Sequence, residues 1–112
     1  MTFRKVAVAI ITPTHTKKSF ELGLEMAKKF DSELTVIECM YKTPPKFYFF
    51  ETKSDKKLTQ NQITKLKEEL KNWKGIAQKQ GVPIKTKLAL TENISHWVID
   101  YVKEKNIDLL IV

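Results

Sequence analysis

Lys5-Val6-Ala7-Val8-Ala9-Ile10-Ile11 is the stretch that decides the fold class of this chain. The run is short and continuously apolar, which is typical of a strand covered on both faces, as strands in parallel sheets are. A second apolar run, Asp108-Leu109-Leu110-Ile111-Val112, closes the 112-residue sequence. A buried strand is a poor place for a domain to end, so we expect a fold that is incomplete at its C-terminus.

Between these two runs, helical and extended patterns alternate. The expected order is a strand over 5–11, a helix from about 16 to 30, a strand over 33–40, an irregular segment over 41–56, a helix over 58–79, a strand over 84–90, a helix from 94 to about 105 and a strand over 108–112. Strands that alternate with helices imply crossover connections. We therefore predict one α/β domain over residues 1–112 with a doubly wound parallel sheet, in the order β-α-β-α-β-α-β.

The boundaries of these elements carry their own signals. Thr14 or Thr16 can cap the first helix, and Asn93 can cap the third. Gly81 follows the long second helix, where a left-handed residue commonly ends a helix. In the strand over 84–90, Lys85 and Lys87 alternate with apolar residues, which predicts a less buried strand at the sheet edge.

The charge of the chain does not by itself indicate a nucleic-acid-binding protein. The formal net charge is +7, but of the 20 basic residues only Arg4 is an arginine. Bidentate recognition of bases and phosphates favours arginine, whereas scattered lysines are typical of a solvated surface. Nucleic acid is therefore not an expected partner, although weak, salt-sensitive attraction to a polyanion is an open alternative.

Cellular location is indicated by two features of the sequence. No apolar run approaches the roughly 18 to 20 residues that span a bilayer. The single cysteine, Cys39, excludes an internal disulfide and suits a reducing compartment. We expect a cytoplasmic protein without a membrane segment.

Several segments together resemble the universal stress protein (UspA) family. The matching segments are residues 6–9, 15–20, 32–37, 92–95, 98–101 and 106–112, in the order and spacing that the family shows. The resemblance implies a five-stranded parallel α/β fold of the adenine nucleotide alpha hydrolase-like kind. It also implies a non-enzymatic role in stress response or regulation, with homodimers formed through the fifth strand.

The resemblance also places an ATP pocket on this sequence. Its positions are Ala9, Ile10, Ile11, Thr12 and Cys39. ATP-binding members carry an aspartate where Ile11 stands, and isoleucine cannot accept a hydrogen bond from ribose or hold a metal ion. Those members also carry a glycine-rich phosphate loop directly after the fourth strand, beyond Val112. We therefore predict weak or absent ATP binding; the alternative is an ATP-binding switch whose phosphate loop lies beyond this sequence.

Other candidate residues give weaker signals. Four consecutive aromatic residues, Phe47, Tyr48, Phe49 and Phe50, should either cover the end of the sheet or contact a protein partner. His15, His96 and Cys39 are too widely spaced to form a recognisable metal motif. The pair Glu68-Glu69 lies in a lysine-rich helix, where solvated ion pairing is the simple interpretation. With no P-loop or nucleophile motif present, we predict that the chain is not an enzyme.

Overall fold

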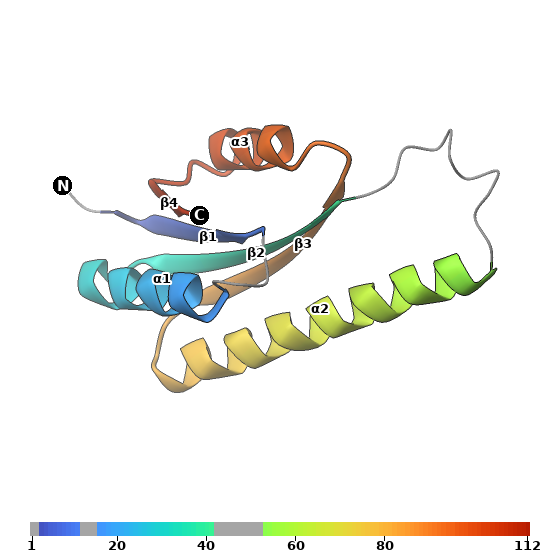
Figure 1. Cartoon of the computed structure of the whole chain (residues 1–112). Coiled ribbons are helices and arrows are strands. Elements are labelled where there is room, and N and C mark those ends of the chain that lie inside the picture. The colour runs from blue at the N-terminus through green and yellow to red at the C-terminus, as the bar shows by residue number, and fades with distance from the viewer. Residues whose placement is uncertain (1–2, 12–15, 42–52) are drawn as a thin grey trace.

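The computed structural model describes residues 3–11, 16–41 and 53–112 (Figure 1). Its elements are β1 (Lys5–Ile10), α1 (Thr16–Phe30), β2 (Glu33–Tyr41), α2 (Lys53–Lys79), β3 (Ile84–Thr91), α3 (Ile94–Glu104) and β4 (Leu109–Ile111). All strand pairs are parallel, and the strand order is β3-β2-β1-β4. The predicted element order, the parallel sheet and the edge position of the third strand are confirmed.

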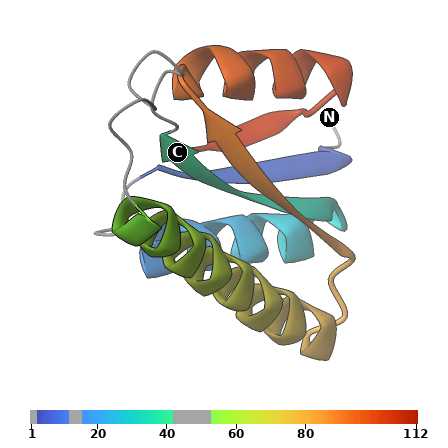
Figure 2. The same cartoon turned by 90° about the vertical axis from the view of Figure 1, so that its right-hand side faces the viewer.

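The sheet separates two layers of helices (Figures 1 and 2). Helices α1 and α2 cover one face, and α3 covers the other. Strand β1 supplies both cores, because successive side chains of a strand point to opposite faces. Val6 and Val8 pack in the cluster under α1 and α2, whereas Ala7 and Ala9 pack in the cluster under α3. This two-sided burial explains why the β1 sequence is apolar without alternation.

Two of the expected boundary residues act as predicted. The side chain of Asn93 accepts a hydrogen bond of 3.0 Å from the backbone N–H of His96 and so caps α3. Gly81 has a φ of 76°, which places it in the left-handed region directly after α2. The start of α2 was predicted too late, at residue 58. The helix begins at Lys53, and its first residues are polar, so they add nothing to the apolar period from which the start was predicted.

The short strand β4 is held to the sheet at its entrance by Asp108. One carboxylate oxygen of Asp108 accepts hydrogen bonds from the backbone N–H groups of Arg4 at 2.8 Å and Lys5 at 3.0 Å. The register then pairs Val8 of β1 with Ile111 of β4. This arrangement makes β1 a central strand and β4 an edge strand.

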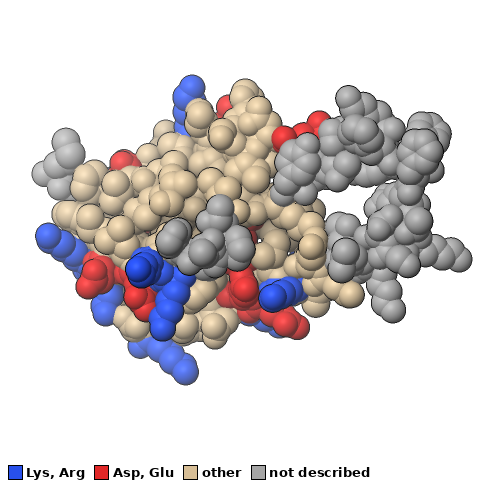
Figure 3. Space-filling model, viewed as in Figure 1, with Lys and Arg blue, Asp and Glu red and all other residues tan. Residues whose placement is uncertain are grey.

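Charged residues are unevenly distributed over the surface. In Figure 3, basic and acidic side chains intermingle over the lower half, where α1 and α2 lie, while much of the upper half is uncharged. Within the described residues, no helix combines the length and the apolar character needed to cross a membrane.

Candidate functional site

The carboxyl ends of β1 and β2 bring two of the predicted pocket residues together. Ala9 and Cys39 are both buried on the α3 side of the sheet, and Ala89 of β3 joins them in the same cluster. Cys39 lies opposite Ala89 in the register, one step beyond the residue paired with the end of β1. Three small side chains thus form a compact apolar floor, against which Ile94 and Trp97 of α3 pack.

The other three predicted pocket positions lie elsewhere. Ile10 belongs to the cluster on the opposite face, with Val6 and Val8. Ile11 follows the end of β1 at the rim of the sheet, with 40% of its surface exposed. Thr12 lies outside the described residues, as does the aromatic segment over residues 47–50.

The thiol of Cys39 is not suited to nucleophilic chemistry. Burial, and secondarily the charge of Glu38, raises the pKa of Cys39 to about 11. A thiol with such a pKa is protonated near neutral pH, whereas the reactive species is the thiolate. Cys39 therefore serves this region as a small hydrophobic side chain.

A buried carboxyl that the sequence analysis did not single out lies beneath this floor. Glu38 is completely buried on the α1 and α2 side, and its two oxygens have no hydrogen-bond partner in good geometry within the described structure. Burial is the first cause that raises the pKa of Glu38 to about 8, and the neighbouring carboxyl of Glu69 raises it further. The indole N–H of Trp73 opposes this rise, although it too lacks a partner in good geometry.

The environment of Glu38 corrects one sequence interpretation. Glu68 is exposed, as expected, but Glu69 is half-buried and faces the carboxyl of Glu38 rather than only solvent. The sequence could have indicated that Glu38 is buried, because Leu34, Val36 and Glu38 alternate along β2 and so share one face of the strand. The proximity of Glu69 to Glu38 could not be predicted in the same way, because it depends on how α2 packs against β2.

Metal-binding residues do not gather in the described structure. No group of three or more histidine, cysteine, aspartate or glutamate residues there could hold an ion. His96 lies 3.1 Å from Asp100, one helical turn away, and both side chains are largely exposed. This contact is an ordinary surface pair on α3.

Comparison with known proteins decides the family. A model described as the universal stress protein family matches residues 2–112. The chain belongs to this family. Among curated proteins, no sequence match was found.

Solved structures of universal stress proteins share the fold at low sequence identity. UspA from Lactobacillus plantarum is 14% identical with a TM-score of 0.81, and the alignment covers 99% of this chain and 77% of that one. A family member from Burkholderia pseudomallei is 14% identical with a TM-score of 0.78, covering 96% and 79%. The universal stress protein from Archaeoglobus fulgidus in complex with dAMP is 15% identical with a TM-score of 0.65, covering 98% and 80%. These likenesses establish the universal stress protein fold for this chain.

Proposed function

We propose that this universal stress protein domain is non-enzymatic and cytoplasmic, and that it acts in stress response or regulation by association, first of all with a second copy of itself. The observation that carries the proposal is the edge strand β4, whose three residues are all apolar and only half-buried. Its outer edge pairs with no other strand in the described structure. An unpaired apolar edge is a template for strand addition.

Self-association should be visible by sedimentation equilibrium at high micromolar concentration. Val112 directly follows β4 and is 72% exposed, so Val112→Lys should place a charge at this edge and weaken the dimer by about tenfold or more. Leu90→Lys makes the same change on the opposite edge strand, where the side chain is 41% exposed, and should leave the dimer unchanged. A strict monomer, or equal effects of the two variants, would contradict association through β4.

A second candidate function is an ATP-binding regulatory switch. The apposition of Ala9 and Cys39 at the carboxyl ends of two neighbouring strands favours it, because ligands of open parallel sheets bind in that region. Structures of other universal stress proteins have been solved with cAMP and with dAMP. Here the exposed side chain of Ile11 at the rim offers no acceptor to a ribose or a metal ion.

Calorimetry with ATP and magnesium separates the two candidates. The unmodified chain should bind more weakly than about 100 μM. Ile11→Asp supplies a carboxylate at the rim and should strengthen binding by about tenfold, the gain expected from one charge-assisted contact. Leu90→Asp adds the same charge to an equally exposed position on β3 and should give no gain. Binding tighter than about 100 μM by the unmodified chain would favour the ATP switch.

A further inference from the structure

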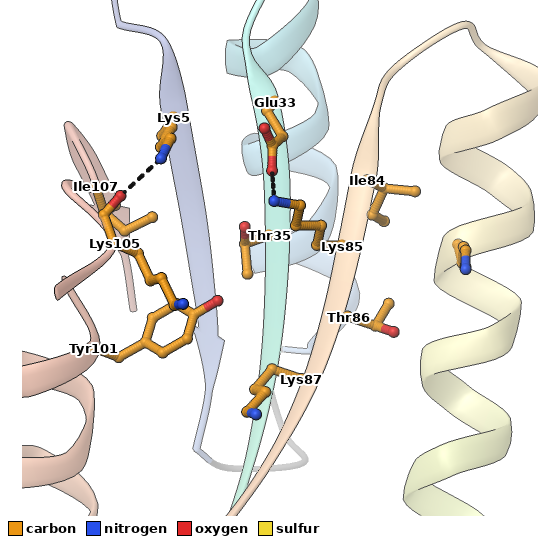
Figure 4. Close-up of a pocket in the computed structure, with 11 residues that line it drawn as sticks. Lys5, Glu33, Thr35, Ile84, Lys85, Thr86, Lys87, Tyr101, Lys105 and Ile107 are labelled. Carbon is orange, nitrogen blue, oxygen red and sulfur yellow. Dashed lines mark hydrogen bonds and ion pairs between the residues drawn. The ribbon is translucent and has the colours of Figure 1, made fainter.

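A second region of the molecule gathers lysine side chains from several elements. A cavity of about 410 Å³ lies over the N-terminal halves of β1, β2 and β3, beside the C-terminal end of α3 (Figure 4). Five lysines and one glutamate line it, with hydroxyl groups from Thr35 and Tyr101. We call it the lysine cavity. Its volume falls within the range of small-molecule sites.

The strand register explains why lysines converge here. Lys5, Thr35 and Lys85 occupy the α3 side of their strands, since Val6, Leu34 and Ile84 pack on the other side. Helix α3 packs against this face through Ile94, Trp97, Tyr101 and Val102. The cavity lies between the C-terminal end of α3 and β3 (Figure 4). Figure 4 shows Lys85 and Lys87 arising from β3, Thr35 from β2, and Tyr101 and Lys105 coming from the α3 side.

Of the five lysines, Lys74 belongs to α2, two are engaged in contacts, and two of those near α3 and β3 are not. The Lys5 amine donates a hydrogen bond of 3.0 Å to the carbonyl oxygen of Lys105, and Lys85 lies 3.0 Å from Glu33. Lys87 and the Lys105 amine form neither a hydrogen bond nor an ion pair with any described residue. Lysine amines act as point charges for phosphate groups. The cavity therefore combines fixed polar walls with two lysine amines that are not engaged by a described residue.

A neighbouring cavity of about 370 Å³ gives the ligand a second part. It shares Lys87, Tyr101 and Lys105 with the lysine cavity and is otherwise lined by Trp97, Asp100 and Glu104. The rings of Trp97 and Tyr101 are stacked, with centroids 5.2 Å apart. Carboxylates repel a phosphate but accept hydrogen bonds from hydroxyl groups. The two cavities together suit a ligand that is anionic at one end and hydroxylated at the other.

We propose that these adjoining cavities bind a small hydroxylated phosphate ester, with its phosphate between Lys87 and Lys105 and its hydroxyl groups near Asp100 and Glu104. This site extends from the N-terminal halves of the strands toward the pocket positions Ala9 and Cys39, since Lys87 and Ala9 both pair with Ile37 of β2. Its proposed binding residues are not among those pocket positions. The site does not depend on ATP binding or on self-association.

Calorimetry on the full chain with ribose 5-phosphate, inorganic phosphate and ribose tests the proposal at a constant ionic strength of about 0.15 M. Ribose 5-phosphate should bind more tightly than inorganic phosphate, and ribose alone should give no heat. The double variant Lys87→Met, Lys105→Met should weaken binding of ribose 5-phosphate by about tenfold or more, because charge-assisted contacts are lost. Methionine retains an apolar stem at these surface positions.

A matched control removes the same charge elsewhere. Lys17→Met, Lys18→Met changes two exposed lysines of α1 and should alter the affinity by less than about twofold. If both double variants weakened binding equally, net charge alone would explain the effect, and the proposed site would be wrong. Equal affinity for inorganic phosphate and the ester would overturn the role of the second cavity. Ile11→Asp should leave the affinity for ribose 5-phosphate unchanged, whatever it does to ATP binding, which keeps the two proposals distinguishable.

Discussion

Replacing Gly23 with alanine is expected to destabilise the domain by about 2 kcal/mol. Gly23 lies in α1 directly over β1, and a Cβ atom at this position would overlap Cγ2 of Val8. Val8 is completely buried in the central strand, and its β-branched side chain has few alternative rotamers. The helix must therefore move away from the sheet, and the loss of packing should lower the urea midpoint of unfolding without changing the m-value.

Gly75 provides a matched control in the other helix on the same face. A Cβ atom there would meet nothing within 4 Å, so Gly75→Ala should stabilise the domain by roughly 0.5 to 1 kcal/mol through helix propensity alone. The two variants make the same chemical change with opposite expected signs. If both variants were stabilising, the result would contradict the close packing of α1 against β1 at Gly23.

A double-mutant cycle can assign the cost of Gly23→Ala to its proposed contact. Val8→Ala alone removes buried methyl groups and should destabilise the domain by about 1 to 3 kcal/mol. In the Gly23→Ala background the same change also removes the overlap, so its cost should fall. Strict additivity of the two changes would mean that Val8 is not the obstacle.

The close packing at Gly23 illustrates what the sequence could and could not predict. Strand β1 was predictable because two-sided burial leaves a continuous apolar run, and β3 was recognised as an edge because Lys85 and Lys87 alternate with apolar residues. Gly23, by contrast, has no signature in the sequence of α1. Its importance depends on the distance between a helix and a strand, which only the packed structure provides.

The candidate sites, too, were only partly predictable from the sequence. Family resemblance identified Ala9 and Cys39 as neighbours, although the strand period alone already separates Ile10 onto the other face. The lysine cavity was not predicted, because its walls come from three strands and the end of α3. Lysines that are scattered in sequence look like a solvated surface until the register aligns them.

Glu38 should make the stability of the domain fall as the pH rises from about 4.5 to 8. The pKa of this carboxyl is about 8 in the folded protein, against an ordinary value of 4.5. Between these values the folded state holds a proton that the unfolded state has released, so the free energy of unfolding decreases with rising pH. Each unit of pKa difference corresponds to about 1.4 kcal/mol, and the full effect is on the order of a few kcal/mol.

The charged groups around Glu38 explain why the neutral form is favoured. Across from it on α2 is Glu69, a like charge, and beside it on β2 is Cys39, whose thiol is neutral. No cation balances an ionised Glu38 within the described structure. Protonation of Glu38 avoids placing two like charges together in a buried environment.

Urea unfolding of the unmodified chain and of Glu38→Gln between pH 5.5 and 8.5 measures the effect. Glutamine keeps the shape of the protonated carboxyl and cannot ionise, so this part of the pH dependence should disappear. The stability advantage of the variant should be small near pH 5.5 and should grow to a few kcal/mol at pH 8.5, because the unfolded state of the unmodified chain releases a proton that its folded state retains up to about pH 8.

Two further variants on α2 identify the neighbour that matters. Glu69→Gln removes the like charge and should lower the pKa of folded Glu38, while burial still keeps that pKa above its ordinary value. The loss of stability should then be smaller and should end at a lower pH. Glu68→Gln removes an exposed carboxyl from the adjacent position and should leave the pH profile unchanged. Parallel profiles for the unmodified chain and Glu38→Gln would show that Glu38 is already ionised in the folded state. A carboxylate in that state would need a compensating cation that the described residues do not provide, and the packing of α2 against β2 would then have to differ from that described.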